Sequence, residues 1–410
     1  MIARGLTRSH RRLKTASMRH VPRLPFAFLF LACALSAQVP DHTTEIVIGR
    51  AVGIRSNILQ QQREISVSLP DGYDSTTERY PVVYVLDGES NFEYTAAIVH
   101  FLAAAERAPA MIVVGINSGE FSQRTHDLTP PTTAVVDNRF TPGGGGADSF
   151  LSFLANEPIP YIDKSFRTRP YRILIGHSFG GLFAIHALVT RPDIFNAYIA
   201  IDPTLSWNDG AEVGRAASFI SQQSELPVDI YVTSANNFGS ATPEVRRFVS
   251  LLDGKTPQGL HWTFEWMETE DHISIPLRSV YAGLDKIFDG WHLTNPLELY
   301  DAGGLEAIDT HFIDGGKRYG YTDRTTPPNV VPMVIAGLIK TGRLDEASAV
   351  LLRNPAAFPP AWNQLDALAR AYESRGDTKS VIRFYRMSLD ANPENDWAKQ
   401  KLVQLGATPK

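Results

Sequence analysis

Apolar and polar positions alternate with two different periods over the first two thirds of the chain. Short runs of β-branched and aromatic residues, each bounded by Gly, Pro, Asp or Asn, predict strands. The predicted strands are 44–52, 63–70, 80–88, 110–117, 171–178, 197–203, 228–235 and 261–268. Intervening segments such as 147–163, 179–191 and 243–253 space apolar residues three and four apart, as amphipathic helices do. The pattern predicts an α/β fold: a doubly wound, mostly parallel sheet that begins with an antiparallel pair.

The strand pattern stops beyond Trp291. Residues 333–354 and 367–395 can be superimposed with a shift of 34, which places Leu338 over Tyr372 and Gly342 over Gly376. This period is typical of tetratricopeptide helix pairs. We therefore expect a linker at 293–327 and tetratricopeptide-like helices at 328–410. Two repeats are fewer than an independent solenoid needs, so they should dock on the preceding domain or pair with another chain. Two unrelated helical hairpins are the alternative.

The charge pattern excludes some functions and predicts export. Of the 410 residues, 43% are hydrophobic and 20% charged, and the net charge of −5 leaves no basic surface for nucleic acid. A basic start followed by "LPFAFLFLACALSA" has the features of a secretory signal over residues 1–37, with Met18 as an alternative start. This apolar run is too short to span a bilayer. We expect a periplasmic or secreted protein, and acylation of Cys33 as a lipoprotein is the alternative.

The stretch "ILIGHSFGGLFAIHAL" places a serine between a predicted strand and a predicted helix. Gly176-His177-Ser178-Phe179-Gly180 fits G-x-S-x-G, in which the glycines permit a sharp turn that exposes the serine hydroxyl. A hydroxyl alone is a weak nucleophile and needs a base and donors for the oxyanion. Ser178 is therefore a candidate nucleophile, and an inert serine in a tight turn is the alternative.

The base should follow the serine and the acid along the chain. The segment 267–276, "METEDHISIP", follows the last predicted strand and supplies His272 on a loop. His177 should point away from the site on the turn, and His186 falls inside the next helix. His272 is therefore the candidate base. The glycines at 143–146 are followed by no Lys-Ser/Thr pair and predict a mobile loop instead of a phosphate site.

Several longer segments carry a resemblance to a known family. "YPVVYVLDGESNF", "RTHDLTPP", "GHSFGGLFAIHALVTRPDIFNAYIAIDPTLSW" and "GLHWTFEWMETEDHISIP" resemble the esterase D-like family of α/β-hydrolases, which includes feruloyl esterases, mycolyltransferases and siderophore esterases. The tail is similar to a bacterial subgroup with C-terminal tetratricopeptide-like repeats. The resemblance implies an α/β-hydrolase domain over 44–292, with Ser178 as nucleophile and His272 as base. It also implies oxyanion donors at the backbone N–H groups of Phe179 and Glu89.

The position of the acid departs from that family. Many relatives carry it after the strand that here reads "VDIYVTSANNFGS", where this chain has Asn236 and Asn237. Asp202 lies at the end of the preceding predicted strand, 197–203, where other α/β-hydrolases place their acid. Asp202 is therefore our candidate, and a turn-forming role is its alternative. Glu244 and Glu270 are weaker candidates.

The function expected from these residues is ester cleavage through an acyl-enzyme, without a metal or organic cofactor. Trp207 and Arg124 are candidates for contact with a small-molecule ester, Arg124 through an anionic group, although an ion-paired arginine is the alternative. The C-terminal helices are a candidate site for a protein partner or a dimer. Two other functions are open: an acyltransferase that uses the same acyl-enzyme, and a binding or scaffold protein with an inactive esterase fold.

Overall fold

The computed structural model describes residues 45–409 except 238, 240, 255 and 354–360. The predicted signal peptide (1–37) and Cys33 lie outside the described residues. The chain divides into two units after Ile46, and the second unit, Val47–Lys410, carries the fold and the candidate site. In the part of the chain described, every helix is too short or too polar to cross a bilayer.

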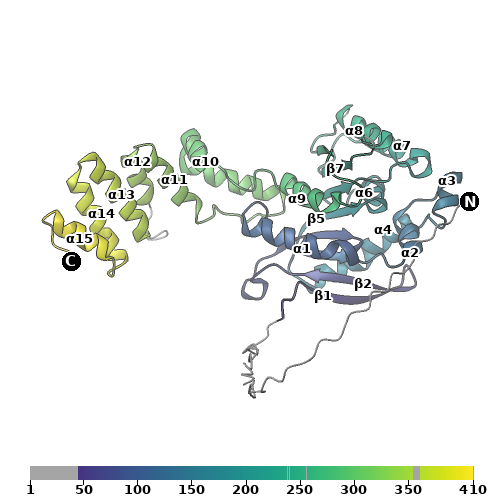
Figure 1. Ribbon diagram of the computed structural model, residues 1–410, viewed down its shortest axis with the longest axis horizontal. Coiled ribbons are helices and arrows are strands. Elements are labelled where there is room, and N and C mark those ends of the chain that lie inside the picture. Colours follow the sequence, from purple (N-terminus) through teal and green to yellow (C-terminus); the bar gives the residue numbers. More distant parts are fainter. Residues whose placement is uncertain (1–44, 238, 240, 255, 354–360, 410) are drawn as a thin grey trace, which may run out of the picture. The chain divides into compact units, whose positions relative to one another are not determined.

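A sheet lies at the centre of this unit (Figure 1). It has eight strands in the order β1-β2-β4-β3-β5-β6-β7-β8. The strands are β1 (Arg50–Ser56), β2 (Gln61–Ser68), β3 (Tyr80–Leu86), β4 (Ile112–Ile116), β5 (Thr168–His177), β6 (Ala197–Ile201), β7 (Asp229–Ala235) and β8 (His261–Met267). Pairing is antiparallel between β1, β2 and β4 and parallel across the rest of the sheet. This is the predicted α/β-hydrolase fold. The first strand begins at Arg50, later than predicted, because Ile46 and Val47 do not pair and are 96% and 72% exposed.

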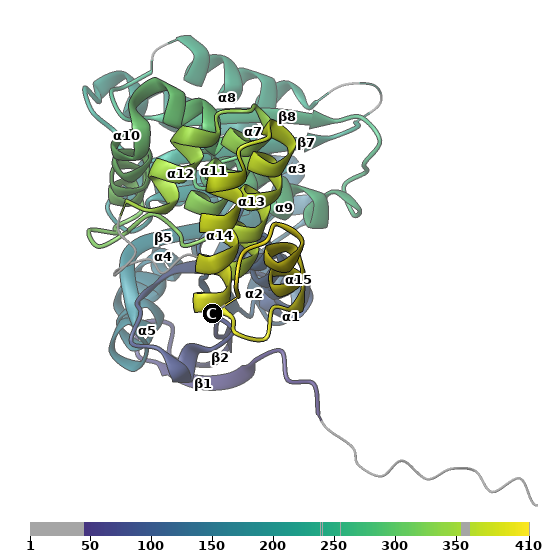
Figure 2. The same cartoon turned by 90° about the vertical axis from the view of Figure 1, so that its left-hand side faces the viewer.

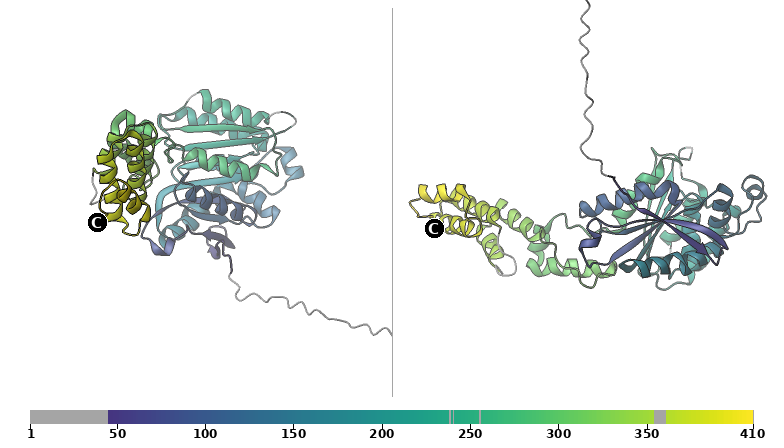
Figure 3. Two further views of the ribbon diagram at one scale, coloured as in Figure 1. Left: turned by 60° about the vertical axis from the view of Figure 1, so that its left-hand side comes forward. Right: turned by 90° about the horizontal axis from the view of Figure 1, so that it is seen from below.

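Helices cover both faces of the sheet (Figure 3). They are α1 (Gly88–Ala104), α2 (Phe121–Leu128), α3 (Val135–Phe140), α4 (Ala147–Asn156), α5 (Pro158–Ser165), α6 (Phe179–Thr190), α7 (Trp207–Gln222), α8 (Pro243–Gly254) and α9 (Ile275–Ile287), with a short 3-10 turn at Tyr73–Ser75. The predicted helical segment 147–163 is divided between α4 and α5. The break comes at Pro158, because proline has no N–H to continue the helix.

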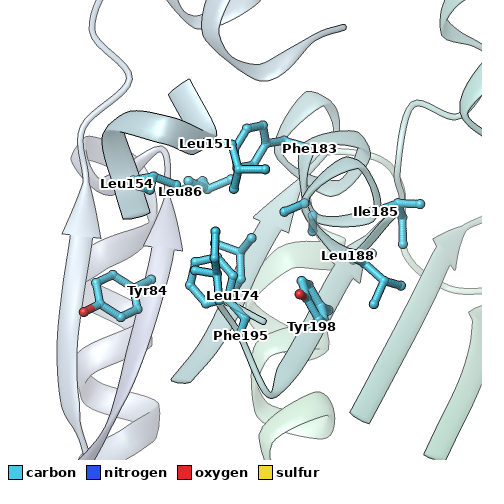
Figure 4. Packing of buried hydrophobic residues seen from close by; sticks show 14 of the residues in the cluster. Tyr84, Leu86, Leu151, Leu154, Leu174, Phe183, Ile185, Leu188, Phe195 and Tyr198 are labelled. Carbon is cyan, nitrogen blue, oxygen red and sulfur yellow. The ribbon is translucent and has the colours of Figure 1, made fainter. Parts of the chain in front are cut away.

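Each face of the sheet has its own hydrophobic core. Residues of α4 to α8 pack on one face, and residues of α1 and α9 pack on the other. On the first face, Tyr84, Leu174 and Tyr198 come from three neighbouring strands and lie beneath Phe183 of α6 (Figure 4). Burying one such large side chain stabilises the fold by about 1.5–3 kcal/mol. The two cores hold the carboxyl ends of the strands, and the helices that follow them, in place.

The C-terminal region is helical, as predicted, and begins earlier than expected (Figure 2). It contains α10 (Pro296–Arg318), α11 (Val330–Lys340), α12 (Leu344–Leu351), α13 (Trp362–Arg375), α14 (Thr378–Ala391) and α15 (Asp396–Gln404). The segment 293–327, expected to be a linker, therefore holds a long helix, which is interrupted at Gly303 and Gly304. Gly342 and Gly376 both follow helices with φ near +80° (77° and 82°), so the 34-residue shift matches equivalent turns.

The end of α10 docks on the sheet domain. Tyr319 is 2% exposed and joins the core of α1 and α9, with its ring 4.7 Å from Phe288 and 5.3 Å from Tyr171. Arg318 forms an ion pair with Asp229 at the start of β7. This docked segment lies in the predicted linker, so docking of the repeats at 328–410 on the preceding domain stays a prediction. Pairing with another chain stays a prediction.

Candidate active site

Ser178 lies at a sharp turn between β5 and α6, as predicted. Its backbone has φ 60° and ψ −116°, a conformation that costs roughly 1–3 kcal/mol for a residue other than glycine. Gly176 is required for this turn, because a Cβ there would lie 2.0 Å from the carbonyl oxygen of Gly180. Gly181 is required as well, because its Cβ would lie 2.9 Å from Cα of Pro203. Ser178 therefore has neither strand nor helix geometry and stands at the turn between β5 and α6.

Three predicted residues from three strand ends meet at this turn. Ser178 Oγ lies 3.1 Å from Nε2 of His272, and Nδ1 of His272 lies 2.6 Å from Oδ2 of Asp202. His272 comes from the loop after β8, and Asp202 follows β6 directly. The imidazole is 44% exposed, whereas the carboxyl side chain of Asp202 is only 5% exposed. The serine and histidine can therefore be approached from solvent, while the carboxylate is buried behind them.

Asp202 is held as an anion by its neighbours. Its second oxygen, Oδ1, accepts hydrogen bonds of 3.1 Å from the backbone N–H of Ala235 and from the hydroxyl of Ser234. Burial by itself would raise the pKa of this carboxyl group, but the hydrogen bonds from His272, Ala235 and Ser234 outweigh burial and lower it. Asp202 has φ 38°, a left-handed conformation that Asp tolerates better than most residues. The carboxylate is thus charged and fixed in orientation.

The two predicted oxyanion donors lie at helix N-termini. Phe179 is the first residue of α6 and Glu89 is the second residue of α1. N–H groups in a first helical turn have no carbonyl partner within their helix and carry a partial positive charge. The side chain of Glu89 accepts a 3.0 Å hydrogen bond from the N–H of Ser118, which fixes this turn.

His177 lies closer to the site than its sequence position suggested. Its ring centroid is 4.6 Å from that of His272, and its Nε2 is buried with no hydrogen-bond partner among the described residues. Burial, followed by repulsion from His272, lowers the pKa of His177 to about 4. The ring is therefore neutral at ordinary pH. The expectation that it points away from the site is not what the structure shows.

Arg124 is paired with a carboxylate. Its Nε and Nη2 donate to the two oxygens of Asp87 at 2.7 and 2.8 Å, and Nη2 also donates to the carbonyl of His177 at 3.2 Å. The guanidinium carbon lies 5.5 Å from the ring centroid of Phe179. The structure thus gives the ion-paired state that the sequence left open as an alternative.

Trp207 is buried beside the same turn. It is 3% exposed, its indole N–H donates to the carbonyl of Pro130 at 2.8 Å, and its ring packs edge-on against Phe179. A Cβ on Gly144 would lie 2.5 Å from the indole, so the glycine loop lies directly on this ring. That loop, predicted to be mobile, is tied down by the N–H of Gly145, which donates to Thr129.

The residues at the other predicted acid positions support the histidine loop. Asn236 donates through its amide to the carbonyl of Glu268 and through its N–H to the carbonyl of Glu270. The carboxylate of Glu270 accepts a 2.6 Å hydrogen bond from Ser274. Asn237 donates to the carbonyl of Ala235. Among the acid candidates, Asp202 is the one whose carboxylate contacts His272, at 2.6 Å from Nδ1.

Sequence reasoning missed three residues here. They are Asp87, which pairs with Arg124, Thr204, whose hydroxyl lies 3.3 Å from Ser178 Oγ, and His177 as a neighbour of His272. Nothing in the local pattern marks Asp87 or Thr204, since their partners are far along the chain. Within the described residues no group of three or more His, Cys, Asp or Glu side chains is arranged to hold a metal.

A hydroxyl, an imidazole and a buried carboxylate in this order form the arrangement used for acyl transfer. A profile of the family described as "Putative esterase" matches residues 56–263, half of the chain. The chain belongs to this esterase family. It is a carboxylic ester hydrolase of the serine hydrolase class. The matched region includes Ser178 and Asp202 and ends before His272.

Two curated relatives and one solved structure are similar to this esterase. The ferri-bacillibactin esterase BesA of Bacillus subtilis is 30% identical over 215 residues, 48% of this chain and 74% of the relative. The siderophore triacetylfusarinine C esterase of Aspergillus fumigatus is 37% identical over 246 residues, 52% of this chain and 82% of the relative. An IroE-like serine hydrolase from Shewanella oneidensis has a TM-score of 0.60 at 26% identity and covers 74% of this chain and 96% of its own.

Proposed function

We propose that this esterase cleaves its substrate through an acyl-enzyme formed on Ser178, with His272 as general base and Asp202 as the acid that orients it. The observation that carries the proposal is the continuous hydrogen-bonded row from Ser178 Oγ through His272 to Asp202, at 3.1 and 2.6 Å. The hydroxyl is within the distance at which a base removes a proton.

In the first step, His272 Nε2 takes the proton of Ser178 while Oγ attacks the ester carbonyl carbon. The carbonyl oxygen becomes an oxyanion, which the N–H groups of Phe179 and Glu89 stabilise. His272 then gives its proton to the leaving alcohol oxygen as the carbon–oxygen bond breaks. In the second step the same imidazole takes a proton from water as the water oxygen attacks the acyl carbon, and it returns that proton to Ser178 Oγ as the carbon–Oγ bond breaks and the acid is released. The buried Asp202 carboxylate stabilises the imidazolium present in both steps.

The substrate class we propose is an ester of the siderophore type. Two relatives that match about half of this chain carry names of enzymes acting on such esters. Arg124 is paired with Asp87 and Trp207 is buried against Phe179, so we propose that neither side chain contacts the substrate directly.

The second candidate function is acyl transfer, in which an alcohol replaces water as the acceptor. The exposed imidazole favours neither acceptor, so product analysis with added alcohols separates the two. A small-molecule product that contains the added alcohol identifies a transferase.

We also propose that the protein is exported. The basic and apolar start of the chain supports cleavage near Ala37. N-terminal sequencing of the protein recovered from the periplasm or the medium tests this, and an acylated Cys33 would identify a lipoprotein instead.

The experiment that tests the catalytic proposal is labelling with a fluorophosphonate, which reacts with an activated serine. The wild type should label and hydrolyse a p-nitrophenyl ester, whereas Ser178→Ala should do neither. Ser218→Ala, at an exposed serine on α7, is the matched control and should behave as the wild type. A wild type that neither labels nor hydrolyses would instead support the scaffold function.

A further inference from the structure

A single arginine joins the two chain segments that carry the proposed oxyanion donors. The guanidinium of Arg124 donates to both carboxylate oxygens of Asp87, at 2.7 and 2.8 Å, and to the carbonyl oxygen of His177, at 3.2 Å. Asp87 stands two residues before Glu89, and His177 stands two residues before Phe179. Arg124 therefore contacts the chain two residues before each of the proposed oxyanion donors.

Asp87 combines a left-handed backbone with a buried charge that Arg124 neutralises. It precedes α1 with φ 55° and ψ 49°, a left-handed geometry that costs roughly 1–2 kcal/mol in a residue other than glycine. Its carboxyl side chain is 10% exposed, and Oδ2 would lie 3.6 Å from a Cβ on Gly180, in the first turn of α6. The carboxylate therefore lies beside the start of the second helix. Its charge, buried there, requires the guanidinium.

Arg124 is itself held firmly. It is 18% exposed and lies over the ring of Phe179. One turn further along α2, Asp127 forms a 2.5 Å ion pair with Arg63 of β2, and both side chains are almost fully buried. Helix α2 is thus fixed to the sheet on one side and to the serine turn on the other.

We propose that Arg124 is a positioning residue that sets the separation of the Glu89 and Phe179 N–H groups, and that it does not bind an anionic substrate. Its hydrogen bonds are made to Asp87 and His177, and its charge is neutralised by the carboxylate. Oxyanion stabilisation depends on donors placed within a few tenths of an ångström, so loss of this cation should affect the transition state more than the bound substrate. The proposal rests on the proposed acyl-enzyme function.

The test compares two esters of the same acyl group, one neutral and one with a carboxylate in the alcohol part. In Arg124→Gln, kcat should fall roughly 10- to 100-fold for both esters, somewhat less than for loss of a whole donor, while KM changes less than about threefold. The affinity for phenylboronic acid, whose adduct with the serine places an oxygen in the oxyanion position, should fall in parallel with kcat. Arg124→Lys keeps the charge but not the paired contacts, so its kcat and its boronate affinity should lie between those of the wild type and those of Arg124→Gln.

Arg107→Gln is the matched control. Arg107 makes the same two-bond contact, with both distances 2.7 Å, to Asp285. Its loss should leave kcat and boronate affinity unchanged. A KM increase for the anionic ester alone, or an unchanged kcat in Arg124→Gln, would overturn the proposal.

If Arg124→Gln does not fold, Asp87→Asn is the second test. It removes the charge of Asp87, and Asn still accepts the left-handed backbone geometry. It should show the same loss of kcat with KM maintained, and normal kcat would also overturn the proposal. Ser178→Ala distinguishes failure of the Arg124 proposal from failure of the proposed acyl-enzyme function. If that variant still cleaves both esters, the acyl-enzyme function itself is wrong, whatever Arg124 does.

Discussion

Replacing Asp202 by Asn tests the acid directly, and the structure fixes how the new amide will lie. Oδ1 of Asp202 accepts from the N–H of Ala235 and from Ser234, both at 3.1 Å. These donors will hold the amide oxygen of Asn at the same place, which turns its NH2 group toward Nδ1 of His272. Nδ1 must then accept a hydrogen bond, so the proton of the neutral ring moves to Nε2. In that tautomer Nε2 cannot take the proton of Ser178.

The size of the effect follows from the charge that is lost. Two unit charges about 4 Å apart interact by about 4 kcal/mol at an effective dielectric near 20. Removing that stabilisation of the imidazolium lowers kcat by about 10³-fold. The wrong tautomer adds to this, and the equivalent change in serine proteases costs about 10⁴-fold. We therefore expect kcat for a p-nitrophenyl ester to fall between about 10³- and 10⁴-fold, with little change in KM.

The assay is steady-state hydrolysis by the wild type, Asp202→Asn and a matched control, Asp229→Asn. Asp229 is a similarly buried carboxylate, 7% exposed against 5% for Asp202, at the opposite end of the neighbouring strand and paired with Arg318. The control should lose stability and keep kcat. A kcat for Asp202→Asn within tenfold of the wild type, in protein with a normal unfolding transition, would refute Asp202 as the acid.

Two further predictions concern the serine turn. Because burial lowers the pKa of His177 to about 4, the unfolded chain binds more protons between pH 6.5 and 4, so stability falls as pH falls through this window, by up to about 3 kcal/mol. Urea unfolding at pH 7 and pH 4 should show a smaller loss of stability in His177→Gln than in the wild type. His261→Gln, at an exposed histidine, is the control and should lose as much as the wild type. Equal losses in the wild type and both variants would contradict this prediction. Gly176→Ala places a Cβ 2.0 Å from a carbonyl oxygen and should destabilise the fold by about 3 kcal/mol and abolish activity. Gly180→Ala, whose Cβ makes only ordinary contacts, the nearest being 3.5 Å to Leu86 Cδ1, should change stability by less than about 1 kcal/mol. Equal urea midpoints for the two variants would disprove the steric argument.

Local patterns predicted the sheet and the serine turn because their causes are local. The β-branched runs mark the strands, and Gly176 and Gly180 flank the serine within five residues. The first strand was predicted too early, at 44–52, because the apolar run before Arg50 has the composition of a strand but no partner strand. Helix α10 was missed because Gly303 and Gly304 interrupt its apolar period.

The site was partly predictable for the same reason. The order serine, acid, histidine pointed to His272 and, with less force, to Asp202, which the structure brings together. The pairing of Arg124 with Asp87 left no trace in the sequence, because 37 residues separate two charged side chains that have ordinary neighbours. Only the folded chain shows that this arginine is neutralised.

The burial of Tyr319 has a practical consequence for anyone who wishes to produce the catalytic part alone. The family match ends at residue 263, yet the core around α9 is completed by an aromatic ring more than 50 residues later. An expression clone that stopped at the family boundary would encode neither His272 nor this ring. A clone that stopped after α9 would still expose Tyr171, against which this ring packs, to water. A fragment that keeps this core complete must therefore run past α10 to Tyr319, through residues that domain comparison alone would discard.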